Sequence, residues 1–440
     1  MGTEMQRLFG TDGVRGVANS ELTPELAYDL ARAAGEGLDR HVVIGRDTRR
    51  SGPMLAAALA AGFNAVGVDT VDLGILPVGA VSRLARDTGA SLGVMVSASH
   101  NPAEDNGIKF FGGDGAKLSD EREAAIERRY FSDEAHVRPV AANVGIQTVM
   151  ADAIDRYVDK VARTVEYSMR GLEFVVDCAN GAASSTAAPL FEKVGATVTI
   201  FADTPDGMNI NAGVGATHPE FVARKANGKV GLAFDGDADR LIAVDEDGEV
   251  VNGDVIMAIF AAFQHQRGKL KGDKVVATVM SNLGFHQAME RLGVEVRVTP
   301  VGDRSVVEEM RSSRAVVGGE QSGHILLEDR STGDGLRTAL RLMEVMASTG
   351  KELRELRTIM TELPQVLTNV RVGSKDGWDT DDDITSSIAT WERQLGSRGR
   401  ILVRPSGTEP LIRVMVEAPT ASEAEQAADS IAETIARRLR

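Results

Sequence analysis

Three aspartates at alternate positions could hold a metal ion. Asp235, Asp237 and Asp239 directly follow the apolar stretch 230–234. Magnesium and calcium both prefer oxygen ligands, so carboxylates grouped in one turn suit either ion. An EF-hand loop is the alternative, but Arg240 stands where that motif needs glycine, and the residues after it favour a strand. Because magnesium takes few protein ligands and pairs with phosphate groups, the sequence predicts a Mg2+ site here.

A loop with two serines follows another apolar stretch. Residues 92–96 lead into the sequence SASHNP, which carries Ser97, Ser99 and His100. A nucleophilic serine needs a base or a metal to activate it, and the Gly-x-Ser-x-Gly turn of esterases is absent. The loop could instead hold a phosphate on serine beside the metal, or simply cap the next helix. The residues alone leave these alternatives open.

The loop RPSGTEP, residues 404–410, has the composition of a phosphate site. It combines Arg404 with the hydroxyls of Ser406 and Thr408 and with backbone amides that Gly407 leaves accessible. A guanidinium, hydroxyl donors and an amide nest together bind phosphate, although a plain turn is the alternative. A P-loop pattern is absent, so a nucleoside triphosphate is not the expected ligand. The N-terminal loop FGTDGVRG, with Arg15, is weaker evidence of the same kind.

The elements that must position these loops recur three times along the chain. Residues 42–73, 174–201 and 275–299 each read as strand, turn, helix, glycine and second strand. Such units imply right-handed crossovers and mostly parallel sheets. Each unit is followed by a further strand that ends at a polar loop. These loops are SASHNP, DGDADR and GGEQSGH, and ligands of open α/β sheets bind beyond such strand ends.

The predicted fold is therefore three similar α/β domains with mixed, mostly parallel sheets around a central cleft. From about Leu363 the pattern changes to a smaller C-terminal α+β domain. Its acidic run from Asp379 to Asp383 is expected to be the solvated start of a helix.

The composition limits the partners. The net charge of −15 argues against nucleic acid and anionic membranes, which bind broad basic surfaces. Cys178 is the single cysteine, so no intramolecular disulfide can form, and its apolar neighbours favour a buried structural thiol. The chain shows neither a signal-like N-terminus nor a long apolar stretch, and we expect a cytoplasmic protein.

Taken together, the loops resemble the α-D-phosphohexomutase superfamily, and within it the bacterial branch that acts on glucosamine phosphates. The resemblance extends from Phe9 to Glu417 and covers nearly the whole chain. The motifs that carry it, in order, are FGTDGVRG, SASHNP with DNGIKFF, DGDADR, SNLGF, VGDR, GGEQSGH, TGDG and RPSGTEPLIRVMVE.

The resemblance implies a four-domain enzyme and a role for each loop. The implied domains are 1–150 for the phosphoserine, 151–251 for the metal, 252–364 for the sugar and 365–440 for the distal phosphate. It selects Ser99 as the phosphorylated serine, with Mg2+ held by its phosphate and the three aspartates. The other implied catalytic residues are Lys109, Arg15, His100 and Arg240. The implied substrate-binding residues are Arg304, Glu320, Ser322, His324, Arg404, Ser406, Gly407, Thr408 and Arg413.

The implied reaction interconverts glucosamine 6-phosphate and glucosamine 1-phosphate through a 1,6-bisphosphate. Lys109 and Arg15 match the family positions nearest the transfer, with His324 as a further candidate for the proton, and the acid–base residue stays open. A hexose 1,6-bisphosphate is the possible activator, a homodimer is expected, and the arginines near the motifs predict a basic cleft. Ala212, Ser305 and a short segment at 221–229 depart from this branch. A phosphoglucomutase or phosphomannomutase is therefore the alternative, followed by a phosphatase and a non-catalytic sugar-phosphate sensor.

Overall fold

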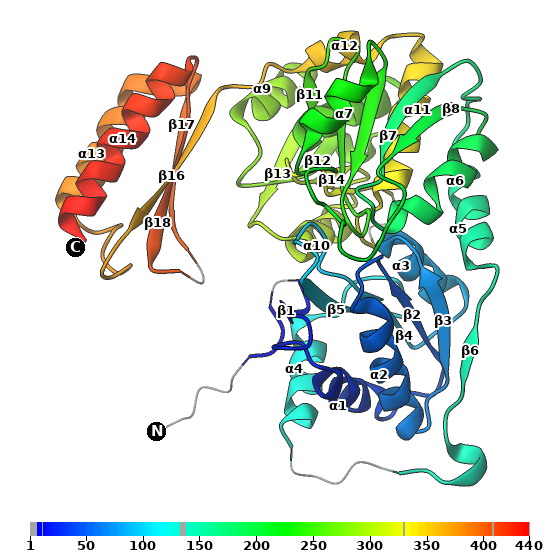
Figure 1. Ribbon diagram of the computed structural model, residues 1–440. Coiled ribbons are helices and arrows are strands. Elements are labelled where there is room, and N and C mark those ends of the chain that lie inside the picture. The colour runs from blue at the N-terminus through cyan, green and yellow to red at the C-terminus, as the bar shows by residue number, and fades with distance from the viewer. Residues whose placement is uncertain (1–6, 11, 133–137, 329–330, 407–408, 440) are drawn as a thin grey trace. The chain divides into compact units, whose positions relative to one another are not determined.

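The computed structural model describes residues 7–10, 12–132, 138–328, 331–406 and 409–439 (Figure 1). The chain forms two compact units. The first comprises Met1–Val279 and Glu295–Thr358, and the second comprises Met280–Val294 and Ile359–Arg440. The three sheets that hold the predicted repeats belong to the first unit, and a fourth, smaller sheet belongs to the second.

The first sheet has the strand order β1-β5-β4-β2-β3-β6. Its strands are β1 (Val14–Val17), β2 (Val42–Arg46), β3 (Thr70–Ile75), β4 (Leu92–Val96), β5 (Asp105–Gly112) and β6 (Gln147–Val149). Strands β2, β3, β4 and β6 run parallel, whereas β5 is antiparallel to both β4 and β1. The helices are α1 (Pro24–Gly35), α2 (Gly52–Ala65), α3 (Val78–Asp87) and α4 (Asp120–Tyr130).

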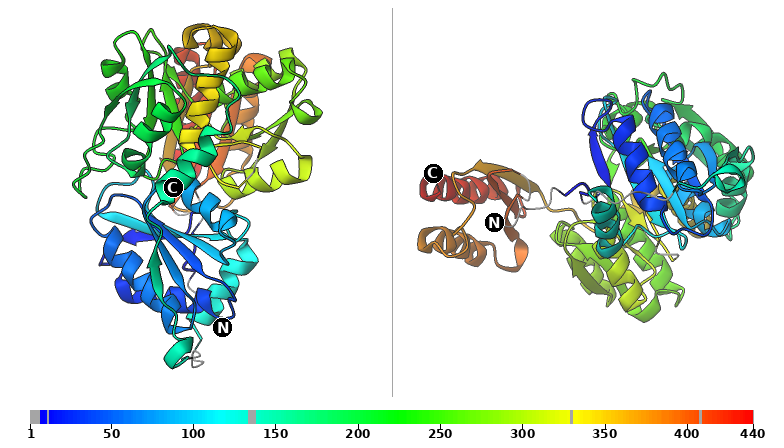
Figure 2. Two further views of the ribbon diagram at one scale, coloured as in Figure 1. Left: turned by 90° about the vertical axis from the view of Figure 1, so that its right-hand side faces the viewer. Right: turned by 90° about the horizontal axis from the view of Figure 1, so that it is seen from below.

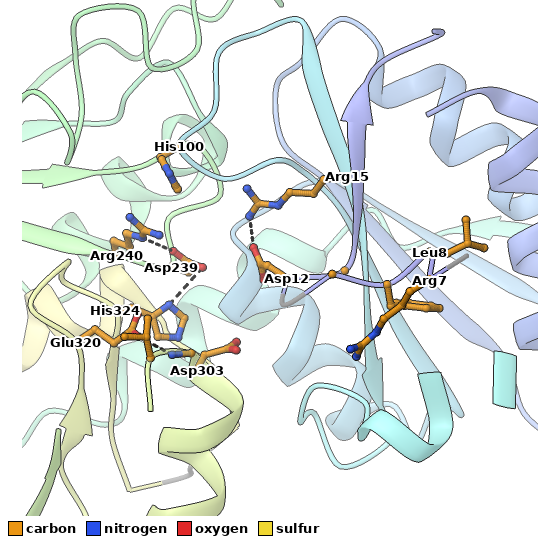
Figure 3. A pocket seen from close by; sticks show the side chains of 15 residues that line it. Arg7, Leu8, Asp12, Arg15, His100, Asp239, Arg240, Asp303, Glu320 and His324 are labelled. Carbon is orange, nitrogen blue, oxygen red and sulfur yellow. Dashed lines mark hydrogen bonds and ion pairs between the residues drawn. The ribbon is translucent and has the colours of Figure 1, made fainter. Parts of the chain in front are cut away.

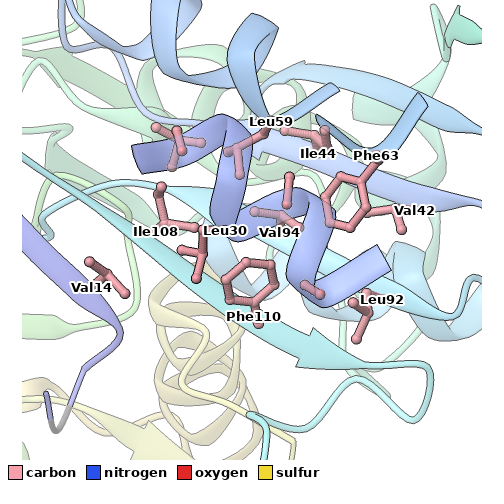
Figure 4. Packing of buried hydrophobic residues seen from close by; sticks show 14 of the residues in the cluster. Val14, Leu30, Val42, Ile44, Leu59, Phe63, Leu92, Val94, Ile108 and Phe110 are labelled. Atoms are coloured by element: carbon pink, nitrogen blue, oxygen red, sulfur yellow. The ribbon is translucent and has the colours of Figure 1, made fainter. Parts of the chain in front are cut away.

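Apolar side chains from both layers form the core of this sheet. Leu30 of α1 and Phe63 of α2 are fully buried, and they pack in one cluster with Ile44, Val94 and Ile108 of the strands (Figure 4). Burying each such side chain contributes roughly 1.5–3 kcal/mol. This packing fixes the ends of β4 and β5, from which the predicted active-site residues emerge.

The second and third sheets repeat the parallel arrangement and each ends in antiparallel strands. The second has the order β11-β10-β9-β7-β8, and the third has the order β13-β12-β14-β15. The second comprises β7 (Glu173–Asp177), β8 (Thr197–Phe201), β9 (Val230–Phe234), β10 (Leu241–Val244) and β11 (Val250–Val251). The third comprises β12 (Lys274–Thr278), β13 (Glu295–Thr299), β14 (Gly318–Gly319) and β15 (Ile325–Leu326). The first unit's further helices are α5 (Ala153–Ala162), α6 (Ala187–Lys193), α7 (Pro219–Ala226), α8 (Gly253–Gln266), α10 (Asp303–Ser313), α11 (Gly335–Thr349) and α12 (Leu353–Leu356).

The second unit contains a three-stranded antiparallel sheet, with α13 (Asp382–Leu395) and α14 (Ala421–Arg438) on one face of it (Figure 2). Its other elements are α9 (Leu283–Leu292), β16 (Gln365–Arg371), β17 (Arg400–Pro405) and β18 (Leu411–Glu417). Asp381 caps α13 by accepting from the backbone of Asp383 and Ile384, so the acidic run does begin a helix. Helix α9 joins this unit because Glu417 accepts from the backbone N–H of Leu283 at 2.8 Å.

The predicted fold class is confirmed, with two local differences. Residues 14–16, the end of the predicted N-terminal loop, instead belong to β1, because the backbone of residues 14–17 pairs with residues 105–108 of β5. In the third sheet, the strand expected before Gly318 forms ladder pairs only at Gly318 and Gly319, opposite Val276 and Ala277. Among the described residues, no helix combines the length and the apolar character that a membrane crossing requires.

The close packing of α1 on α2 makes a stability prediction at Gly62. A Cβ added there would lie 2.3 Å from the carbonyl oxygen of Tyr28 and 2.7 Å from Cβ of Ala31. We expect Gly62→Ala to lower the free energy of unfolding by about 1–3 kcal/mol, because the two helices must separate. Denaturant unfolding followed by circular dichroism measures this effect.

The neighbouring Ala61 provides the control because its side chain is exposed on the same helix. Ala61→Val should cost only the small difference in helix propensity, below about 1 kcal/mol. Equal losses in the two variants would contradict the close contact at Gly62.

Candidate active site

The loops that follow β4 and β9 meet in the first unit. The hydroxyl of Ser99 donates a hydrogen bond of 2.6 Å to Oδ2 of Asp235. Both side chains are buried, and they come from residues 136 positions apart in the chain. Each follows the carboxyl end of a parallel strand, β4 in the first sheet and β9 in the second, and the two sheets meet at these ends.

The two serines of this loop have different surroundings. Ser99 has a positive φ of 53°, which is uncommon for a residue other than glycine and costs of order 1 kcal/mol. Its hydroxyl faces the aspartate loop, and Nδ1 of His100 lies 3.4 Å from it. Ser97 instead donates at 2.6 Å to the buried carboxylate of Asp47. The geometry therefore favours Ser99 as the reactive serine.

Asp235, Asp237 and Asp239 form a buried cluster in which one ligand atom from each lies within 4.8 Å of the others. Of the described side chains, Oδ1 of Asp237 and Oδ1 of Asp239 are among the buried oxygens without a hydrogen-bond donor. Burial, together with the charges of Asp239 and Asp237, raises the pKa of Asp235. Buried oxygens without donors, in a group of carboxylates, fit a hard divalent cation.

Cationic side chains surround the cluster. Nζ of Lys109, on β5, lies 2.9 Å from Oδ2 of Asp237 and 3.1 Å from Oδ2 of Asp12. Burial alone would lower the pKa of Lys109, but the carboxylates of Asp12 and Asp237 raise it well above its ordinary value. Nε of Arg240 lies 3.7 Å from Oδ1 of Asp239. The cluster is thus compensated by cations from two different sheets.

His324 and His100 differ in their partners. Nδ1 of His324 lies 3.4 Å from Oδ2 of Asp239, and its Nε2 accepts from the backbone N–H of Gly333 at 3.2 Å. Burial, and then the charges of Arg240 and Arg15, lower the pKa of His100 to about 4. His100 is therefore neutral at pH 7 beside the Ser99 hydroxyl.

Sequence reasoning missed Asp12 and Lys117. The carboxylate of Asp12 contacts the guanidinium of Arg15 and lies 2.9 Å from Nζ of Lys117. Lys117 also reaches Oδ1 of Asp303 at 3.2 Å, at the start of α10. Asp12 stands inside the motif FGTDGVRG, so its position in that motif was the available signal.

These loops enclose a cavity of about 490 Å³ (Figure 3). The predicted residues that line it are Arg15, His100, Asp239, Arg240, Glu320 and His324. The lining includes three arginines and four carboxylates, so this cavity carries both signs of charge. Arg15 and Arg240 are each accompanied by an aspartate. The basic cleft stays a prediction, because it also included Arg404 and Arg413 of the second unit.

Arg304 and Ser322 do not line this cavity. Arg304 contacts Asp120 and lies 2.8 Å from Oε2 of Glu123, both on α4, so it ties α10 to the first sheet. The hydroxyl of Ser322 is buried and is one of the described polar groups without a hydrogen-bond partner.

The remaining predicted residues belong to the second unit. Arg404 and Arg413 are cross-strand partners on β17 and β18, and burial and the charge of Arg413 lower the pKa of Arg404. Ser406 accepts at its hydroxyl from the backbone N–H of Glu409 at 3.3 Å. Nζ of Lys375, which sequence reasoning missed, donates to the Ser406 carbonyl at 2.8 Å. Gly407 and Thr408 lie outside the described residues.

Family models match nearly all of the chain. They are described as phosphoglucomutase/phosphomannomutase alpha/beta/alpha domain I at residues 6–137, domain II at 155–248, domain III at 252–363, and the C-terminal domain at 367–434. The predicted domain boundaries near 150, 251 and 364 stay a prediction.

Curated relatives and solved structures are similar over the full length. Phosphoglucosamine mutase of Moorella thermoacetica is 53% identical over 96% of this chain and 97% of its own. The enzyme of that name from Oceanobacillus iheyensis is 49% identical, over 99% and 100%. A phosphoglucomutase/phosphomannomutase family structure from Burkholderia thailandensis has a TM-score of 0.82 at 25% identity, covering 98% of both chains. An N-acetylphosphoglucosamine mutase structure from Aspergillus fumigatus, with GlcNAc-6P and magnesium, has a TM-score of 0.69 at 19% identity, covering 98% and 95%.

The carboxylate cluster predicts binding of a divalent cation. Saturating Mg2+ or Mn2+ should raise the melting temperature, since a ligand at 100 times its Kd adds about 2.7 kcal/mol to stability. We expect Asp237→Asn to weaken that binding by about tenfold or more, because affinity follows the number of charged ligands. Thermal unfolding at a series of metal concentrations measures the shift.

Asp247→Asn is the matched control. Asp247 is an exposed aspartate outside the cluster, in the turn between β10 and β11. The variant should leave the metal-dependent shift unchanged. The cluster would not be a cation site if both variants responded to metal like the wild type.

Proposed function

The chain belongs to the phosphoglucomutase/phosphomannomutase family, and from this premise we propose that it interconverts glucosamine 6-phosphate and glucosamine 1-phosphate. The observation that carries the proposal is the hydrogen bond of 2.6 Å between Ser99 and Asp235. It sets a serine hydroxyl against a cluster that fits a divalent cation. The glucosamine substrate follows the names of the relatives that are 48–53% identical.

The proposed metal is Mg2+, held by Asp235, Asp237 and Asp239 together with a phosphate oxygen carried by Ser99. When bound, it supplies positive charge beside the transferring phosphoryl group. The donor set consists of oxygens alone, which suits magnesium.

In the proposed reaction, phosphorylated Ser99 donates its phosphoryl group to the free hydroxyl of the sugar monophosphate. The bond between phosphorus and Ser99 Oγ breaks and a bond to the sugar oxygen forms. The proton lost by the sugar hydroxyl is balanced by one taken up at Ser99 Oγ, which ends as a free hydroxyl. The resulting 1,6-bisphosphate turns over, and its other phosphoryl group returns to Ser99. Catalysis of this kind depends mainly on positioning and on stabilising charge.

The chain's own residues have defined parts in this scheme. Arg240 and Arg15 neutralise the transferring phosphoryl group, and Arg15 is held near Ser99 by donating to the Ala98 carbonyl at 3.2 Å. Lys109 and Arg15 are both cations, Lys109 because Asp12 and Asp237 raise its pKa, so we propose that they stabilise the oxygen that loses its proton. His324 is the further candidate for the proton itself. Neutral His100 orients the Ser99 hydroxyl.

Other residues hold the substrate in this proposal. Glu320 lines the cavity and accepts from the backbone N–H of Gly302 at 3.0 Å, which leaves its other oxygen for a sugar hydroxyl. Ser322 and Arg304 are the further substrate-binding residues that the resemblance implies, although neither lines this cavity and Arg304 is paired with Asp120 and Glu123. The distal-phosphate residues are Arg404, Ser406, Gly407, Thr408 and Arg413.

We also propose a cytoplasmic homodimer that a hexose 1,6-bisphosphate can prime. Apolar side chains at residues 140–149 are exposed, among them Val140 at 74% and Val149 at 72%, next to the edge strand β6. Light scattering should give twice the chain mass, and a monomer at micromolar concentration would contradict the dimer.

The test of the proposed function combines three substrates with one variant. The 6-phosphates of glucosamine, glucose and mannose are assayed for the 1-phosphate isomer, and glucosamine should give the highest kcat/KM. Ser99→Ala should lose at least about 10³-fold of that activity, because the phosphate carrier is gone. Phosphopeptide mapping of the wild type should place the phosphate on Ser99.

Each rival has its own outcome. Preference for glucose or mannose would indicate a phosphoglucomutase or phosphomannomutase, and release of free phosphate without isomer would indicate a phosphatase. Binding without turnover would indicate a sensor. Phosphate on Ser97 instead of Ser99 would overturn the mechanism.

A further inference from the structure

Ser99 is held in its unusual backbone conformation by a side chain from another loop. A residue with positive φ persists only where its surroundings determine it, so the contacts of the Ser99 peptide groups are informative. Its carbonyl accepts from Nη2 of Arg49 at 2.9 Å and from Nδ2 of Asn211 at 2.9 Å. Its N–H donates to Oγ of Ser97 at 2.9 Å.

Arg49 is fully buried and uses its whole guanidinium group on this loop. A guanidinium has five N–H donors. Nη2 donates to the carbonyls of Ser99 and Asn101 at 2.9 and 2.8 Å. Nη1 donates to the carbonyls of Pro102 and Asp105, the latter at 2.9 Å.

The fifth N–H donor, on Nε, connects Arg49 to the backbone N–H of Ser99 through Asp47 and Ser97. Nε donates to Oδ2 of Asp47 at 2.9 Å, and the same oxygen accepts from the Ser97 hydroxyl at 2.6 Å. Because Ser97 in turn accepts from the Ser99 N–H, the pair Asp47–Arg49 controls both peptide groups that flank the Ser99 side chain. The side chains of Arg49 and Asp47 are both 0% exposed, so water does not compete for these contacts.

We propose that Arg49 is a positioning residue for the phosphoryl transfer: it holds the loop 99–105 so that Oγ of Ser99 points at the metal-binding aspartates. The inference rests on the proposed function. Its side chain contacts backbone carbonyls and Asp47 and does not reach the reacting oxygen, so it acts through Ser99. Lysine cannot replace it, because an ammonium has three donors and lacks the planar fork.

The experiment measures kcat, KM for glucosamine 6-phosphate, phosphate on Ser99 and melting temperature in Arg49→Lys and Arg49→Ala. We expect Arg49→Lys to lower kcat by about 10²-fold, the loss typical of a reacting atom displaced by 1 Å. KM should stay within about threefold, since the side chain makes no contact with substrate. Guanidinium ion should restore at least about tenfold of kcat to Arg49→Ala by filling the vacated site.

Arg341→Lys is the control for loss of a mostly buried arginine elsewhere in the same unit. Arg341 lies on α11 and contacts Glu344 and Glu328. Arg341→Lys should lower the melting temperature and leave kcat unchanged. The proposal is overturned if Arg49→Lys keeps wild-type kcat, or if guanidinium restores melting temperature in Arg49→Ala without restoring kcat.

Ser97→Ala tests the same network where the Arg49 variants fail to fold. It removes both the acceptor of the Ser99 N–H and the donor to Asp47, and we expect kcat to fall by about tenfold at unchanged KM. If the Arg49 variants are insoluble and Ser97→Ala keeps wild-type kcat, Arg49 has only a structural role and the proposal is overturned. Wild-type protein without phosphate on Ser99 would instead refute the proposed function itself.

Discussion

Burying three carboxylates within 4.8 Å of one another is the constraint on which the rest of the first unit depends. Like charges at that distance repel, and burial adds a desolvation cost to each of them. The compensating groups come from different sheets: Lys109 lies on β5 of the first, and His324 precedes β15 of the third. The aspartates themselves follow β9 of the second. Electrostatic compensation therefore requires the ends of three sheets to meet.

Asp12 extends this pattern to the rim of the cavity. Its carboxylate contacts three cations, which are Arg15, Lys109 and Lys117. Burial alone would raise the pKa of Asp12, but the nearby lysines and Arg15 hold it well below its usual value. The carboxylate is therefore charged, and it fixes the three cations before any ligand arrives. Such preorganisation is what makes electrostatic stabilisation effective in enzymes.

The strand-end loops could be predicted from sequence because they depend on local pattern. Apolar runs ending at SASHNP and DGDADR place Ser99 and Asp235 just beyond strand ends, and the repeat suggests that these ends face one cleft. The partner of Arg304 could not be predicted, because Asp120 and Glu123 lie on a helix of another sheet. Asp12 was overlooked for the same reason. Its partners are 97 and 105 residues away, and no local period reveals such pairs.

The ion pairs between cations and aspartates also matter for the proposed reaction, in which the charge on Ser99 changes. A phosphoserine carries about −1.5 to −2 charges at pH 7, and this charge leaves Ser99 and returns in every turnover. A site made only of arginines and lysines would lose its counter-charge at that moment, and the cations would repel one another. Here Lys109 has carboxylate partners that belong to the protein itself, Asp12 and Asp237. A site with both signs of charge is therefore better suited to the proposed change of charge on Ser99 than a purely basic cleft would be.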